Sequence, residues 1–326
     1  MSEQDGLIGA YILDGKGGGR ELDWPTLEQG VAADDRLWVH LDRNGEKSED
    51  WLRMKSGLGQ LQADALLADE TRPRVAFMHE GILMTLRGVN LNPGADPEDM
   101  VSLRIWVDEK KIITVRLRRL MAVNDVRERI AIGKGPVSIS DTLRLLAVGL
   151  IQRMNPVIDD MNDDIDGLEN DMVENPGATA DIRHRLKDLR RQAITLRRYL
   201  APQREAVARV HSEGVTWMPT DHRLAFRECA DQVARIVEDL DAMRERAAVI
   251  QDELTNRAAE HMNRNMYTLS VVAALMLPLG VITGMLGMNV GGLPLAENKD
   301  GFVMVMGFLS CVVALQVWIF KRLKWI

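Results

Sequence analysis

The sequence is poor in the residues that mark several common classes of protein. Aromatic residues make up 5% of the 326 positions, and the formal net charge is -7. Because nucleic-acid-binding surfaces combine a basic stripe with aromatic side chains, this composition argues against a nucleic-acid partner. There are two cysteines: Cys229 lies in a charged segment and Cys311 in an apolar one, which predicts neither a disulfide framework nor a cysteine metal site.

Several motifs are also missing. The first residues have no basic stretch followed by an apolar core, so we expect no signal peptide. The glycine-rich segment 15–19 lacks the order of a phosphate-binding loop, and a surface turn is the favoured interpretation. No nucleophile or metalloprotease motif is present, so we do not expect an enzyme.

Two long apolar stretches occupy the C-terminal part of the chain. Residues 265–296 and 301–320 carry no charge, and each is at least as long as the roughly twenty residues that cross a bilayer as a helix. Lys321, Arg322 and Lys324 follow the second stretch, and the positive-inside tendency places that end in the cytoplasm. We therefore predict a two-span protein with both termini in the cytoplasm and a short external loop.

Three stretches carry a resemblance to a known family. They are 87–94 (Arg-Gly-Val-Asn-Leu-Asn-Pro-Gly), 99–102 (Asp-Met-Val-Ser) and 287–294 (Gly-Met-Asn-Val-Gly-Gly-Leu-Pro). A Gly-Met-Asn tripeptide that closes a first C-terminal span resembles the signature of the CorA metal-ion transporter superfamily. The three stretches together are similar to its ZntB zinc-transporter branch, and the resemblance covers essentially the whole chain.

The resemblance implies a fold, an assembly and a substrate. We expect an α+β cytoplasmic domain, long stalk helices and a transmembrane hairpin, assembled as a funnel-shaped homopentamer with the first span lining the pore. The expected location is the inner membrane of a bacterium. The implied substrate is Zn²⁺, with inward movement linked to protons. If ions are recognised through their water shell, Cd²⁺, Ni²⁺ and Co²⁺ should pass as well. A CorA-type Mg²⁺, Co²⁺ or Ni²⁺ channel is the alternative, and a membrane-anchored helical scaffold is a third.

The first part of the chain has the pattern of a mixed α/β domain. Apolar runs of strand length occur at 10–13, 37–41, 74–78, 82–89, 103–107 and 112–117. Ser48 is predicted to cap one short helix, and 60–67 to form another. After about residue 123 only helices are expected.

A helical hairpin is predicted next. A helix capped by Ser138 or Ser140 should run towards Met172 with a kink at Pro156, and its second half is rich in aspartate. The following helix is rich in arginine. We favour a salt-bridged, solvated hairpin for these charges, and a divalent-cation site on the acidic helix is the alternative.

One very long helix is predicted to lead into the membrane. It runs from about residue 223 to Pro278, roughly 80 Å at 1.5 Å per residue. Its apolar stripe includes Leu240 and Met243, and we expect this stripe to hold the assembly together. The predicted divisions are therefore 1–137, 138–218, a stalk at 219–265, spans at 266–289 and 301–320, a loop at 290–300 and a tail at 321–326.

A pore requires several copies around an axis, because two helices enclose no interior. One face of the long helix is small or apolar and is predicted to line that pore. Its residues are Asp252, Thr255, Met262, Met266, Leu269, Ala273, Leu277 and Gly280. A neighbouring face through Val272, Met276 and Thr283 remains an alternative.

The outer mouth is assigned to Gly287, Met288 and Asn289, where ions should pass with their water shell. Glu297 and Asp300 in the loop should attract cations. No residue is a strong candidate for a first-shell metal ligand, and the weak candidates are Asp252, His261 and Glu297. The other five histidines are interpreted as surface or structural residues.

Overall fold

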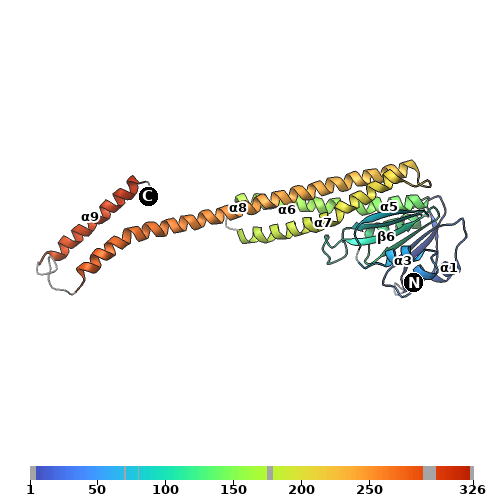
Figure 1. The fold of residues 1–326 in the computed structure, drawn as a ribbon, viewed down its shortest axis with the longest axis horizontal. Coiled ribbons are helices and arrows are strands. Elements are labelled where there is room, and N and C mark those ends of the chain that lie inside the picture. Colours follow the sequence, from blue (N-terminus) through green and yellow to red (C-terminus); the bar gives the residue numbers. More distant parts are fainter. Residues whose placement is uncertain (1–4, 70, 80, 175–178, 289–298, 324–326) are drawn as a thin grey trace. The chain divides into compact units, whose positions relative to one another are not determined.

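The computed structural model describes residues 5–69, 71–79, 81–174, 179–288 and 299–323. The chain divides into two compact units, Met1–Gln251 and Asp252–Ile326. The first contains a β-sheet and several helices, and the second consists of the last part of a long helix and one further helix (Figure 1).

The sheet has seven strands in the order β2-β1-β3-β7-β6-β5-β4. The strands are β1 (Leu7–Leu13), β2 (Gly19–Glu21), β3 (Arg36–Asp42), β4 (Arg74–Met78), β5 (Gly81–Gly88), β6 (Val101–Val107) and β7 (Lys111–Arg116). Only the β3–β7 pair is parallel, and the other neighbours are antiparallel. Every residue of β6 is buried, as expected for an inner strand covered on both faces.

The six predicted apolar runs coincide with β1 and β3–β7, and the segment 108–110 joins β6 to β7. Strand β2 was missed because all of its residues are exposed and it has no apolar run. The glycine-rich segment before it is a turn, in which the Asp14 carboxylate accepts the N–H groups of Lys16 and Gly18 at 2.7 and 2.9 Å. A strand follows this turn instead of a helix, so the turn interpretation is confirmed.

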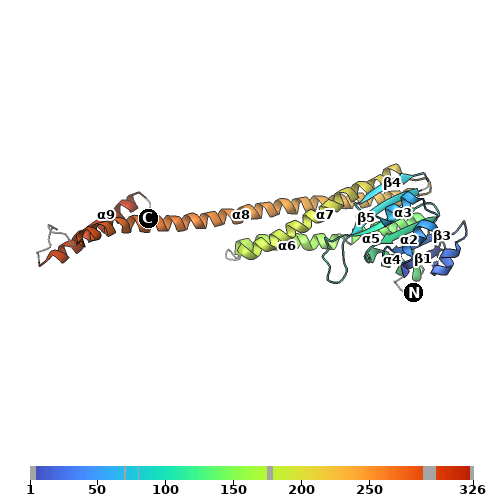
Figure 2. The same cartoon turned by 60° about the horizontal axis from the view of Figure 1, so that its bottom comes forward.

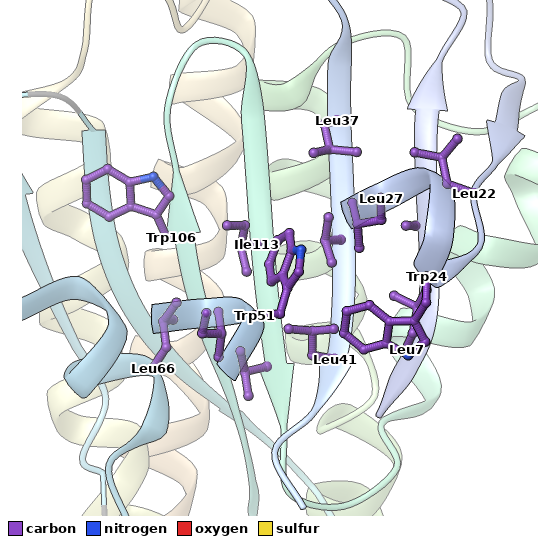
Figure 3. Close-up of a cluster of buried hydrophobic side chains, with 14 of the residues drawn as sticks. Leu7, Leu22, Trp24, Leu27, Leu37, Leu41, Trp51, Leu66, Trp106 and Ile113 are labelled. Atoms are coloured by element: carbon purple, nitrogen blue, oxygen red, sulfur yellow. The ribbon is translucent and has the colours of Figure 1, made fainter. Parts of the chain in front are cut away.

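Seven helices lie wholly within the described part of the first unit. They are α1 (Trp24–Gln29), α2 (Ser48–Met54), α3 (Gln60–Leu67), α4 (Met121–Ala131), α5 (Ile139–Gln152), α6 (Asn155–Glu174) and α7 (Thr179–Glu213). Helices α1, α2 and α3 cover one face of the sheet, where Trp24, Trp51 and Leu66 pack against Leu41 and Ile113 of the strands (Figure 3). Burial of these large apolar side chains is the main source of the stability of this layer.

Helix α5 packs against strands β3, β5 and β7 and covers the other face of the sheet. The close approach is possible because β5 ends in Gly88, where an added Cβ would lie 2.7 Å from Leu150 Cδ2. Ser138 caps α5 by accepting the Asp141 N–H at 3.1 Å, which confirms one of the two predicted caps.

Two local predictions were wrong. Ser48 does not cap α2: it is the first helical residue, and its hydroxyl donates to the Asp42 carbonyl at 2.6 Å. The predicted kink at Pro156 is a break, because α5 ends at Gln152 and α6 begins at Asn155. Proline is well tolerated in the first turn of a helix, where its missing N–H would have no partner, and Pro156 lies in the first turn of α6.

Helix α8 (Thr220–Leu286) is the long helix that was predicted. Its first part lies beside α6 and α7 in two views of the molecule (Figures 1 and 2). The apolar stripe is buried within this single chain, with Leu240 at 0% and Met243 at 1% exposure. The premise that only other copies can cover this stripe is therefore wrong, because Leu240 and Met243 are already buried within one chain.

Candidate functional site

The predicted pathway lies in the second unit, in α8 beyond Gln251 and in α9 (Gly301–Arg322). Within the described ranges, these are the two helices that are long and apolar enough to cross a membrane, and their most apolar windows are not buried. An apolar helix left uncovered by its own chain needs lipid or another protein around it. The two predicted spans are therefore present as helices.

The predicted pore face of α8 is uncovered along its length. Leu269 and Leu277 are both 72% exposed, and Met262 and Met266 are 59% and 54% exposed. The half-buried residues of this segment instead include Val271, Leu275, Pro278, Ile282 and Leu286. At 100° per residue the centre of that half-buried stripe lies about half a turn around the helix from the predicted face.

The alternative face through Val272, Met276 and Thr283 is also exposed. It lies between the predicted face and the half-buried stripe, so exposure in one chain does not choose between the two. Within a single chain the predicted lining residues follow one side of one helix, and none of them faces another across a space. A conduit lined by them requires further copies.

The three candidates nearest the start of this segment are Asp252, Thr255 and His261, and all three are exposed on α8. Among the residues that the structure describes, no group of three His, Cys, Asp or Glu side chains is placed to hold a metal ion. The assigned residues Asn289 and Glu297 lie outside the described residues, so neither is located here.

Gly287 follows the last residue of α8, and its N–H donates to the Thr283 carbonyl at 2.9 Å. A Cβ built on Gly287 would lie only 3.2 Å from that same carbonyl oxygen. A side chain at this position would therefore meet the carbonyl closely, which is a steric reason for glycine. Met288, the next residue, is 49% exposed.

The two ends of helix α9 differ in charge. Asp300 precedes α9, and its carbonyl accepts the Met304 N–H at 3.1 Å. Lys321 and Arg322 occupy the last turn of α9, and Arg322 lies 5.3 Å from the centre of the Trp318 ring. Negative charge at a helix start and positive charge at its end both stabilise the helix dipole.

The acidic helix α6 was predicted to pair with the arginines of α7. The two helices do pack together, but through apolar residues such as Ile165 and Leu186. Of the predicted arginines, Arg185 reaches an α6 carboxylate, Asp171, at 2.6 Å. Two further α6 carboxylates are paired from α8, where Arg246 contacts Asp166 at 2.5 Å and Glu169 at 2.7 Å.

These contacts show which of the two interpretations, a salt-bridged face or a cation site, applies to three of the α6 carboxylates. Asp166, Glu169 and Asp171 are in ion pairs. Arg246 also holds the pKa of Glu169 below its usual range, chiefly through a hydrogen bond. The acidic helix is therefore a salt-bridged face along its second half, and α8 supplies a cation that the sequence pattern did not indicate.

Two histidines have structural roles. His40 is fully buried, its Nδ1 lies 2.9 Å from the Thr114 hydroxyl, and burial lowers its pKa well below the ordinary value. His222 at the start of α8 contacts Ser140 at the start of α5 at 2.9 Å. Both contacts join segments more than 70 residues apart in the sequence.

Sequence reasoning missed the structural role of Arg87, although it lies in one of the stretches that carry the resemblance. Its guanidinium donates to the carbonyls of Thr71 at 2.8 Å and Met100 at 2.6 Å. It also stacks on Tyr199 of α7, with its central carbon 4.0 Å from the ring centre. Arg87 therefore ties two loops and α7 to strand β5.

Comparison with known proteins identifies the family. A model of the CorA-like Mg²⁺ transporter protein family matches residues 34–322. The chain belongs to this family. It is 39% identical to the divalent cation transporter CmaX of Pseudomonas aeruginosa, over 99% of this chain and 98% of CmaX. It is 36% identical to the zinc transport protein ZntB of Pectobacterium atrosepticum, over 99% of this chain and 97% of that protein.

Solved structures support the same assignment for this CorA-family chain. The full-length CmaX structure superposes with a TM-score of 0.84 and covers 99% of both chains at 39% identity. The CorA magnesium transporter of Methanocaldococcus jannaschii superposes with a TM-score of 0.82 at 20% identity, covering 98% of this chain and 99% of the other. The predicted α+β domain, long helices and C-terminal helix pair are thus confirmed as the CorA fold.

Proposed function

We propose that this CorA-family chain moves divalent cations, with Zn²⁺ as the main substrate, inward across a bacterial inner membrane. The family match over residues 34–322 carries this proposal. The names of two relatives that align over nearly the whole chain, a divalent cation transporter and a zinc transport protein, support the substrate class. Both termini lie in the cytoplasm in this proposal.

The proposed conduit is formed by five copies, with α8 around the axis and α9 outside. The support is the long uncovered face of α8, which carries no charge from Asn265 to Leu286. Leu269, Leu277 and Met266 form narrow apolar rings that close the path when water leaves them. Asp252 forms an acidic ring where the path opens towards the cytoplasm, and it raises the local concentration of cations.

At the outer mouth the ions pass with their water shell. Removing water from Zn²⁺ or Mg²⁺ is costly, and the Gly287-Met288-Asn289 tripeptide offers no thiolate, imidazole or carboxylate to replace it. The Asn289 carboxamide offers an oxygen acceptor and N–H donors to the bound water. Glu297 and Asp300 attract cations to the mouth. Recognition through water separates similar ions poorly, so Cd²⁺, Ni²⁺ and Co²⁺ also pass.

The alternative substrate is Mg²⁺, and the family model's own description and the CorA fold favour it. Flux into proteoliposomes that hold the purified full-length chain separates these possibilities. Each metal is offered in turn under imposed pH and voltage gradients, and its entry is followed with an enclosed fluorescent chelator. Zn²⁺ entry that rises with an inward proton gradient is the expected result.

Faster entry of Mg²⁺ than of Zn²⁺ at equal concentration would support the Mg²⁺ channel instead. Entry of no metal at all would leave the membrane-anchored scaffold as the remaining hypothesis. Matched liposomes without protein measure leakage through the bilayer.

A further inference from the structure

A shallow hollow in the first unit lies between the β5–β6 side of the sheet and helix α7. Its volume is about 270 Å³, and its lining includes Arg87, Arg118, Arg198 and Tyr199. A second hollow of about 380 Å³ shares Arg87, Arg198 and Tyr199 with the first. We call the two together the arginine hollow. Its residues belong to the first unit, whereas the predicted pore residues belong to the second.

The aromatic ring of Tyr199 is flanked by two of these arginines. The guanidinium carbon of Arg87 lies 4.0 Å from the ring centre and that of Arg198 lies 4.7 Å from it. Arg198 also donates to the Tyr199 hydroxyl at 2.9 Å. Contacts with the ring restrict the positions of both guanidinium groups.

A further arginine, Arg104, adds positive charge on this face of the sheet. In the β5–β6 ladder Arg104 pairs with Thr85 while Ser102 pairs with Arg87, so Arg104 lies on the same face as the hollow. Its side chain is buried, and its Nη2 donates to the Asp69 carbonyl at 3.2 Å, while its Nε and Nη1 have no hydrogen-bond partner among the residues that the structure describes. Burial and the charges of Arg43 and Arg87 lower the pKa of Arg104 to about 10.

The carboxylates at the arginine hollow do not balance this charge. Asp69 is paired with Arg43 at 2.5 Å, and Glu98 Oε1 lies 3.0 Å from Arg191 Nη2, which leaves Asp99 at the rim. Arg118 and Arg198 are exposed and form no ion pair with any residue that the structure describes. The described part of the hollow therefore has an excess of positive charge.

We propose that the arginine hollow binds a phosphate group, either free or carried by a small molecule such as a nucleotide. Planar guanidinium groups match phosphate oxygens in pairs, and an arginine fixed by stacking loses less conformational freedom on binding. The Thr195 and Ser102 side chains add hydroxyl groups to the same lining. A cation is repelled here, so this site does not hold the transported metal and does not depend on the proposed transport.

Equilibrium dialysis of the purified full-length chain tests the site with radiolabelled inorganic phosphate in one arm and radiolabelled ATP in the other. A metal-free, low-chloride buffer prevents competition. We expect saturable binding in at least one arm, and the tighter arm identifies the source of the phosphate group. The double variant Arg118→Gln, Arg198→Gln should bind at least tenfold more weakly. Arg204→Gln, at an exposed arginine of the same helix outside the hollow, should bind as the unchanged chain does.

Both substituted arginines are exposed, so the double variant should keep its melting temperature and its loss of binding is not a loss of folding. The proposal is overturned if neither ligand binds saturably, or if the double variant binds as tightly as the unchanged chain. It is also overturned if chloride displaces the label as effectively as unlabelled phosphate, because the hollow would then be a general anion site.

Discussion

The side-chain amide of Gln203 on α7 pairs with both backbone groups of Arg87 on β5. Its Oε1 accepts the Arg87 N–H at 2.7 Å, and its Nε2 donates to the Arg87 carbonyl at 3.0 Å. Gln203 is fully buried and takes the place that a neighbouring strand would have in the sheet. Helix α7 is thereby fixed to the β5 backbone.

Replacing Gln203 by Ala should destabilise the chain by about 2 to 4 kcal/mol, because a buried N–H and a buried carbonyl both lose their partner. Thermal unfolding of the full-length protein in detergent measures the effect. Gln152→Ala, at an exposed glutamine at the end of α5, is the control and should be nearly neutral. Equal melting temperatures for the two variants would contradict the proposed role of Gln203.

Replacing Leu240 by Glu should unfold the first unit and not merely separate the copies. Leu240 is fully buried within its own chain, and an unpaired buried carboxylate costs several kcal/mol. Leu224→Glu, at a half-exposed leucine of the same helix, is the control. A folded monomer with an unchanged melting temperature would show that the stripe serves assembly after all, and native mass measurement with circular dichroism detects it.

The ion pairs of Arg246 should give a small, acid-sensitive contribution to stability. Its hydrogen bond lowers the pKa of Glu169 from 4.5, so the contribution is present above that pH and is lost as the pH falls through the lowered value. Because the groups are partly exposed, Arg246→Gln should cost about 0.2 to 1 kcal/mol at neutral pH. Melting temperatures of this variant and the unchanged chain should converge in acid, and a constant difference would contradict the assignment.

Gly287→Ala and Asn289→Ala should each abolish metal flux while the protein still assembles. For Gly287 the added methyl group would press on the Thr283 carbonyl at 3.2 Å. Gly307→Ala in α9, where an added Cβ meets nothing within 4 Å, is the matched control and should keep its flux. Glu297→Ala should weaken uptake only at low metal concentration. Flux at the unchanged rate from Asn289→Ala would refute the role given to the tripeptide.

The loop between the spans should be reachable only from outside the cytoplasm. A cysteine at position 298 in a Cys311→Ala background tests this with a membrane-impermeant thiol reagent. Cys229 should stay unmodified, since burial raises its pKa to about 12 and leaves almost no thiolate. Labelling of the cysteine at position 298 from the cytoplasmic side only would contradict the predicted topology.

The sequence by itself determined the elements with strong local signals. Apolar runs predicted six of the seven strands, and two uncharged stretches predicted the C-terminal helices. The Gly-Met-Asn tripeptide and its context indicated the family, which the comparisons confirm. These signals are local because burial on one or both sides leaves a pattern within a few neighbouring residues.

Only the tertiary structure decided which surfaces meet. The pattern of α8 showed an apolar stripe but not that its partners are α6 and α7 of the same chain. The acidic run of α6 predicted arginine partners, yet Arg246 comes from a helix about 80 residues away. The Gln203 to Arg87 pair joins residues 116 positions apart and has no local signal at all. Periodicity states which side of an element is buried, while the partner is set by the packing of segments far apart in the sequence.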